Sequence, residues 1–130
     1  ILGLPGESPE MLAETIRYVN ALPVGGVKLS MLHILKNTRL ADIYAQEPFP
    51  LFTPESYTSC VISCIEMLRP DIVIERMTGD GPRDLLIAPT WSLHKRNVLN
   101  STHQEMKRRD SFQGKQWQVH PAAGSMITEK

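Results

Sequence analysis

Apolar residues recur with helical spacing in two long stretches of the chain. Leu12, Ile16 and Val19 form a stripe within residues 9–22, which Pro23 ends. A second stripe lies within residues 54–69, and Pro70 follows it. Its members are Tyr57, Cys60, Val61, Cys64, Ile65 and Leu68. We therefore predict two long helices, and both starts, Ser8-Pro9-Glu10 and Thr53-Pro54-Glu55, carry the hydroxyl, proline and carboxylate favoured there.

Other stretches have the pattern of strands or of further helices. Residues 27–35 begin with alternating apolar positions and end almost entirely apolar, which is typical of a strand in a covered sheet. Residues 71–77 form a second predicted strand, and Ile1-Leu2 has the pattern of a strand end. Further helices are predicted over residues 39–45 and from Trp91 or Ser92 to about Arg109, whereas residues 84–89 are apolar without a clear type.

The predicted strands and helices alternate along the chain. That order is typical of parallel strands joined by right-handed crossovers. We therefore expect an α/β fold with about three βα units over residues 1–117, as the C-terminal part of a larger barrel or doubly wound sheet. A strand at residue 1 also predicts an exposed strand edge that can pair with a second copy of the chain. Residues 118–130 lack periodicity, and we expect a disordered tail there.

Composition narrows the class of protein without indicating a function. The 130 residues carry no net charge, with 42% hydrophobic and 22% charged residues, as in ordinary globular proteins. No run of about 18 apolar residues suggests a membrane span, and no basic-then-apolar leader precedes the first helix. We therefore expect a cytoplasmic protein.

The cysteines, Cys60 and Cys64, permit two interpretations. A CxxxC pair supplies two thiols, which is half of a typical metal ligand set. Both cysteines also fall on the apolar face of the helix predicted over residues 54–69, where cysteine behaves as a small hydrophobic residue. We therefore predict core thiols and no metal ligands.

The turn Gly3-Leu4-Pro5-Gly6-Glu7 is the best candidate for a cofactor site. A glycine-rich turn between a strand and a helix exposes backbone N–H groups and lets a ligand approach the chain. It lacks the lysine and extra glycines of a phosphate-binding loop, and Glu7 would repel phosphate. The turn suits a neutral or cationic ligand contacted through the backbone, and a plain tight loop with Glu7 at the helix dipole is the alternative.

A second candidate site follows the strand predicted over residues 71–77. Active sites of parallel barrels lie at the carboxyl ends of the strands, where Glu75, Arg76 and Asp80 would contact a ligand. His33 lies near the end of the preceding predicted strand and is a third candidate for ligand contact. The alternatives are a turn built from residues that tolerate positive φ and a structural histidine.

Basic residues with nearby aromatic residues characterise the C-terminal third of the chain. Such a combination can bind nucleic acid, although a solvated helix with a basic last turn has the same pattern. The residues concerned are Lys95, Arg96, Lys107, Arg108 and Arg109, with Trp91, Phe112 and Trp117 flanking them.

Several motifs resemble those of radical S-adenosylmethionine enzymes. The turn Ile1-Leu2-Gly3-Leu4-Pro5-Gly6-Glu7-Ser8 is similar to the turn near the fifth barrel strand of these enzymes, and residues 27–41 are similar to the sixth-strand region. More specific similarity lies in residues 74–82, 85–92 and 107–114. Over about residues 1–117 the chain resembles the YhcC/YtqA-like bacterial subfamily of radical S-adenosylmethionine proteins.

The resemblance implies the C-terminal portion of a partial (β/α) barrel with parallel strands. It also implies S-adenosylmethionine and a 4Fe–4S cluster in the parent enzyme, reductive cleavage of S-adenosylmethionine to a radical, and in some members a link to tRNA wobble-uridine modification. Backbone at Gly3, Leu4 and Pro5 would border the adenine end of S-adenosylmethionine. His33, Arg76 and Asp80 are the expected substrate-binding residues.

The chain departs from this family's pattern in three places. It has no CxxxCxxC motif, and Cys60 and Cys64 cannot replace it. The close-spaced Gly-x-x-Glu form is one residue longer here, and Asn37 stands where relatives often have glycine. We therefore expect a fragment that is inactive alone, retains neither cofactor and pairs with a missing N-terminal barrel half. The alternative is a non-catalytic α/β binding or docking domain that contacts RNA.

Overall fold

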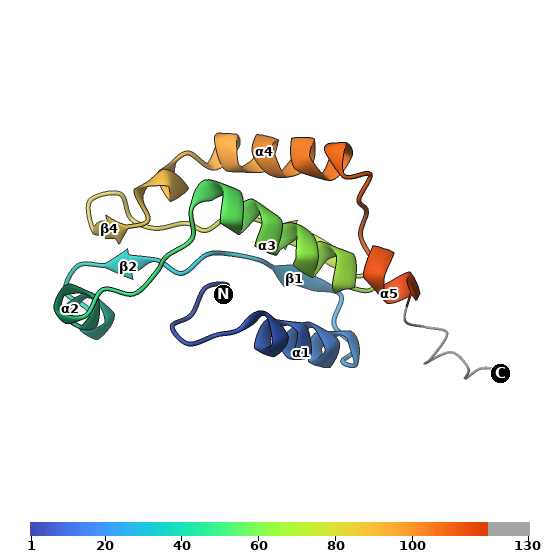
Figure 1. The fold of residues 1–130 in the computed structure, drawn as a ribbon, viewed down its shortest axis with the longest axis horizontal. Coiled ribbons are helices and arrows are strands. Elements are labelled where there is room, and N and C mark those ends of the chain that lie inside the picture. The colour runs from blue at the N-terminus through green and yellow to red at the C-terminus, as the bar shows by residue number, and fades with distance from the viewer. Residues whose placement is uncertain (120–130) are drawn as a thin grey trace.

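The computed structural model describes residues 1–119, in which helices pack together with a few short strands (Figure 1). Except for residues 118 and 119, the tail predicted over residues 118–130 lies outside the described residues. The helices are α1 (Pro9–Asn20), α2 (Arg39–Gln46), α3 (Pro54–Met67), the 3₁₀-helix η1 (Thr90–Leu93), α4 (Lys95–Arg108) and α5 (Lys115–Val119). The strands are β1 (Gly26–Lys28), β2 (Ile34–Leu35), β3 (Val73–Arg76) and β4 (Leu86–Ala88).

Three chain segments run parallel at the centre of the fold. β1 pairs with β3 in parallel, with Gly26 opposite Val73 and Val27 opposite Ile74. Leu2 forms a parallel bridge with Met31, just beyond β1. The predicted parallel arrangement is therefore confirmed for these segments, whereas the strands within residues 1–119 form two separate two-stranded sheets and no barrel.

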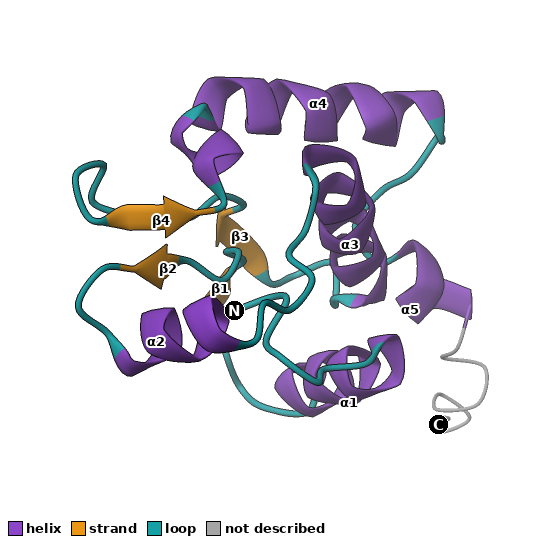
Figure 2. Ribbon diagram, turned by 60° about the vertical axis from the view of Figure 1, so that its left-hand side comes forward, coloured by secondary structure: helices purple, strands orange, loops and turns teal. Residues whose placement is uncertain are grey.

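The strand predicted over residues 27–35 is wrong in its second half. The segment divides into β1 and β2, and β2 pairs antiparallel with β4 rather than continuing the parallel sheet. Only residues 77–85 join β3 to β4, which is shorter than the dozen or more residues that a parallel crossover needs. The chain therefore turns back and runs antiparallel, beside the left-hand end of the molecule in Figure 2.

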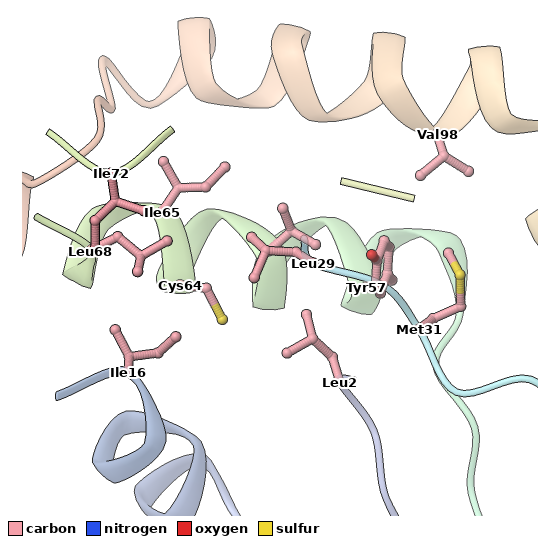
Figure 3. Close-up of a cluster of buried hydrophobic side chains, with 11 residues drawn as sticks. Leu2, Ile16, Leu29, Met31, Tyr57, Cys64, Ile65, Leu68, Ile72 and Val98 are labelled. Atoms are coloured by element: carbon pink, nitrogen blue, oxygen red, sulfur yellow. The ribbon is translucent and has the colours of Figure 1, made fainter. Parts of the chain in front are cut away.

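α3 lies at the centre of the hydrophobic core, between α1 and α4. Its apolar stripe faces Leu2, Leu29 and Met31 from the parallel segments (Figure 3). The predicted stripe is confirmed, since Tyr57, Val61, Cys64, Ile65 and Leu68 are buried in the core, with Cys60 packed partly buried against the same cluster. None of the helices described is long and apolar enough to cross a membrane.

Local signals position the helix starts. The Ser8 and Thr53 hydroxyls accept hydrogen bonds from the N–H groups of Met11 and Ser56, as the predicted caps require. α1 and α3 end at Asn20 and Met67, two residues before the predicted ends. The last long helix begins at Lys95, because η1 replaces its predicted first turn, and α5 was not predicted.

The departure at Asn37 has a backbone explanation. Asn37 has φ +63°, in the left-handed region that glycine adopts freely. Asparagine is one of the few other residues that enter this region at modest cost. The backbone at this position therefore accepts either glycine or asparagine.

Candidate functional site

The residues predicted to bind a ligand come together where the parallel segments end. Gly3 follows Leu2, His33 lies two residues beyond Met31, and Gly79 follows the end of β3. The Leu2 N–H donates to the Ser30 carbonyl oxygen at 2.7 Å, and the Leu32 N–H donates to the Leu2 carbonyl oxygen at 3.0 Å. These hydrogen bonds hold the first turn against the end of β1, at the edge where barrel enzymes place their active sites.

The turn after Leu2 is reversed by two glycines with positive φ. Gly3 has φ +90° and Gly6 has φ +80°, and the Glu7 N–H closes the turn by donating to the Leu4 carbonyl oxygen at 3.0 Å. A Cβ atom on Gly3 would lie 2.7 Å from Phe52 Cε2, whereas one on Gly6 would meet nothing within 4 Å. Gly3 is therefore held against an aromatic ring, and Gly6 faces open space.

A cavity of about 440 Å³ lies beside this turn, between the start of α1 and the outer side of α3. Its lining comprises Gly3, Glu7, Ser8, Pro9, Leu12, Ala13, Phe52, Ser59, Cys60, Ser63 and Met67. Of the three predicted cofactor-contacting residues, Gly3 lines the cavity, and Leu4 and Pro5 lie in the exposed turn instead. A ligand at Leu4 and Pro5 would therefore contact the open edge rather than enter this cavity.

His33 is held between two turns of the chain. The Ser92 hydroxyl donates to the Pro89 carbonyl oxygen at 2.8 Å and lies 3.1 Å from His33 Nε2. Because the hydroxyl proton is used in that bond, we assign Nε2 as the donor. Partial burial lowers the pKa of His33, and the charge of Lys95 lowers it further.

Gly79 and Gly81 leave room for the His33 ring. A Cβ atom on Gly79 would collide with the imidazole, and one on Gly81 would lie 3.2 Å from His33 Cδ2. A side chain at Gly79 would therefore displace the ring from Ser92, whereas one at Gly81 would require only a small shift of the ring. The Gly-Asp-Gly sequence predicted as a ligand-binding turn is, in the structure, a cradle for His33 with Asp80 at its centre.

Asp80 pairs with two cations from different elements. Arg76 Nη1 contacts Asp80 Oδ2, and Lys95 Nζ contacts Asp80 Oδ1. All three side chains are about half exposed. The structure therefore joins the predicted residues His33, Arg76 and Asp80 in one place and adds Ser92 and Lys95. The sequence held one indication that Lys95 has a role beyond the helix. A cation in the first turn of a helix is unfavourable, because it opposes the helix dipole.

The two cysteines differ in surroundings. Cys64 is fully buried in the core, as predicted, while Cys60 is partly buried and lines the cavity beside Gly3. A hydrogen bond between the thiols lowers the pKa of Cys60 and, together with burial, raises the pKa of Cys64. Within residues 1–119, no three His, Cys, Asp or Glu side chains group as metal ligands.

The basic residues predicted to contact nucleic acid lie at opposite ends of α4. Lys95 and Lys107 are twelve positions apart, which corresponds to about 18 Å along a helix. Arg108 and Arg109 both pair with Glu105, and their hydrogen bonds lower the pKa of that carboxyl to about 2. Arg109 also donates to the Ser59 hydroxyl at 2.9 Å. The cations therefore form two groups rather than one continuous patch.

Residues 24–108 match the model of the Radical_SAM C-terminal domain, and this chain belongs to that family. It is 37% identical over 118 residues to the uncharacterized protein YtqA of Bacillus subtilis, covering 91% of this chain and 37% of that protein. It is 31% identical to MJ0486 of Methanocaldococcus jannaschii over 115 residues, covering 88% of this chain and 36% of that protein. It is also 31% identical over 91 residues to protein YhcC of Escherichia coli, and the alignment covers 70% of this chain and 29% of YhcC. The chain thus spans about a third of the length of these relatives.

Proposed function

We propose that this chain forms one wall of the reaction chamber in a radical S-adenosylmethionine enzyme. The observation that carries the proposal is the convergence of Gly3, His33 and Gly79 at the carboxyl ends of three parallel segments. Membership of the Radical_SAM C-terminal domain family supports the same assignment. In that enzyme, S-adenosylmethionine bound at a 4Fe–4S cluster supplies radical chemistry through its reductive cleavage.

The residues of this chain fit the edge of an S-adenosylmethionine site. The positive φ of Gly3 and the exposed Leu4-Pro5 segment present backbone to a ligand with little side-chain obstruction. The same residues do not fit a cluster site, because Cys64 is sealed in the core and Cys60 has no second accessible thiol beside it within the described residues. Cluster ligands would therefore come from another part of the parent enzyme.

Two exposed hydrophobic residues support association with that other part. Ile1 and Val73 lie on or beside the parallel segments and are 67% and 60% exposed. Burying these two side chains against other protein would remove their apolar surface from water. We propose that the rest of the barrel covers them, and pairing of two copies through the same edge is the alternative arrangement.

Photo-crosslinking tests the position of the cofactor. The full-length protein would be reconstituted anaerobically and illuminated with an 8-azidoadenosyl analogue of S-adenosylmethionine. The proposal predicts crosslinks in the tryptic peptide that ends at Arg17 and contains Gly3, Leu4 and Pro5. Excess S-adenosylmethionine should suppress the crosslink, and crosslinks confined to other peptides would overturn the assignment of this turn.

A second candidate function is RNA contact through the end of α4. The observation that favours it is the exposed Arg108 side chain, at 70%, beside Lys107 and Arg109. Alanine at these three positions should weaken tRNA binding and reduce its dependence on salt. Alanine at three exposed cations elsewhere, Arg17, Lys36 and Arg39, serves as the control, and equal effects of the two triple variants would remove this candidate.

A further inference from the structure

We propose that Arg76, Lys95 and Asp80 form a binding site for an oxyanion, either a carboxylate or a phosphate group, of the enzyme's substrate. This inference rests on the function proposed above and specifies the substrate class. The charges at the carboxyl edge of the strands are unbalanced. Arg76 and Lys95 both bind the one carboxylate of Asp80, so one positive charge is left uncompensated by the trio.

The two cations retain donors for a ligand. A guanidinium has five N–H donors and an ammonium has three, and the contacts with Asp80 use only part of each set. All three side chains are about half exposed, so an incoming group can reach them. Glu75 is next to Arg76 in the sequence, but its side chain lies against Gly26. Arginine and lysine together are the usual partners of carboxylate and phosphate groups.

The trio is positioned by contacts that a simple surface ion pair lacks. Gly79 and Gly81 pack against the His33 ring on either side of Asp80, and the Ser92 hydroxyl contacts Nε2 of that ring. Lys95 follows η1, which contains Ser92, so Lys95 is attached to the segment that contacts His33. Preorganised donors bind a ligand with less loss of side-chain freedom than mobile ones.

The position of the trio favours contact with the substrate over contact with a ligand in the cavity beside Gly3. That cavity is lined by residues of α1, α3 and the turn before α1 and includes neither Arg76 nor Lys95. The trio instead lies at the ends of β1 and β3, where the parallel segments present their active-site edge. The attraction for an oxyanion comes from the charges of Arg76 and Lys95.

The test uses full-length protein labelled with ¹³C at histidine, with the His33 signal assigned from a His33→Gln variant. Inorganic phosphate and acetate are titrated at constant ionic strength, with chloride as the reference anion. The inference predicts a saturable shift of the His33 signal with phosphate, acetate or both, and none with chloride. The anion that binds more tightly identifies the source of the oxyanion.

Variants make the prediction specific. Arg76→Gln and Lys95→Gln should each weaken binding by about tenfold or more, whereas Lys95→Arg should retain it. Asp80→Asn should tighten binding by about three- to tenfold, because it removes the like charge that competes for the two cations. Arg17→Gln, on exposed α1 surface, is the control for loss of a positive charge and should change nothing.

Two results would overturn the inference. One is a His33 response to phosphate and acetate no different from that to chloride, and the other is unchanged or weaker binding in Asp80→Asn. Both readouts are independent of S-adenosylmethionine. If the protein cleaves S-adenosylmethionine and binds neither oxyanion, this inference fails alone. If it binds an oxyanion with the predicted variant pattern and never cleaves S-adenosylmethionine, the proposed function fails instead.

Discussion

Replacement of Gly3 by alanine tests how tightly the candidate cofactor turn is held. The backbone at Gly3 has φ +90°, and the added Cβ would lie 2.7 Å from Phe52 Cε2. Phe52 cannot move freely, because its ring packs edge-on against the buried Tyr57 ring at a centroid distance of 5.6 Å. Gly6 provides a matched control in the same turn, with φ +80° and nothing within 4 Å of an added Cβ.

The expected magnitudes follow from these two environments. An alanine held at positive φ costs about 1–2 kcal/mol of unfolding free energy, and Gly6→Ala should lose only that amount. Gly3→Ala should lose about 1–3 kcal/mol more, since a methyl group forced into a packed region shifts its neighbours. The difference between the two variants therefore measures the contact with Phe52, with the backbone cost removed.

Urea denaturation of the full-length protein, followed by tryptophan fluorescence, provides the assay. Trp91 donates its indole N–H to the Phe52 carbonyl oxygen at 2.9 Å, so its emission reports directly on this region. The Phe52→Leu background should bring the two alanine variants closer together, because the obstructing ring is gone. Equal stability of Gly3→Ala and Gly6→Ala in the unaltered background would refute the packing described for the turn.

Three other predictions concern the residues that support the site. Tyr57→Phe should lower the unfolding free energy by about 1–2 kcal/mol, because it removes the 2.7 Å hydrogen bond from the Tyr57 hydroxyl to the Met77 carbonyl oxygen, measurable by urea denaturation against the unaltered protein. Folded-state stability should decrease as the pH falls below about 6.5, since the lowered pKa of His33 leaves the unfolded state binding more protons, and His33→Gln should flatten this slope in denaturation curves between pH 5 and pH 7. In thiol labelling followed by peptide mapping, Cys60 should react in the native protein and Cys64 only after unfolding, and equal native rates would contradict the core position of Cys64.

Local features of the fold were predictable because short segments determine them. The hydroxyl caps at Ser8 and Thr53 and the apolar stripe of α3 depend on residues within a few positions of one another. The helix ends were less accurate, because Asn20 bonds across the fold to Arg69 and Met67 and thereby takes part in ending both α1 and α3. Such contacts are fixed only when distant segments meet.

Local sequence patterns could not predict that β2 pairs with β4, nor all the residues that meet in the site. The apolar run over residues 84–89 has no period that distinguishes a strand from a helix. His33 and Ser92 are 59 positions apart, and Asp80 and Lys95 are 15 apart, so their contacts follow from the tertiary fold. His33, Arg76 and Asp80 nevertheless lie near one another, because all three lie at or beyond the ends of the parallel segments, at the same edge.

Formation of 5′-deoxyadenosine by the full-length protein is the most direct test of the proposed radical enzyme. The protein would be reconstituted with iron and sulfide without oxygen, reduced with dithionite and incubated with S-adenosylmethionine. The account predicts a brown protein and release of 5′-deoxyadenosine and methionine that requires the reductant. A correctly folded protein that stays colourless through reconstitution and releases no 5′-deoxyadenosine would contradict it.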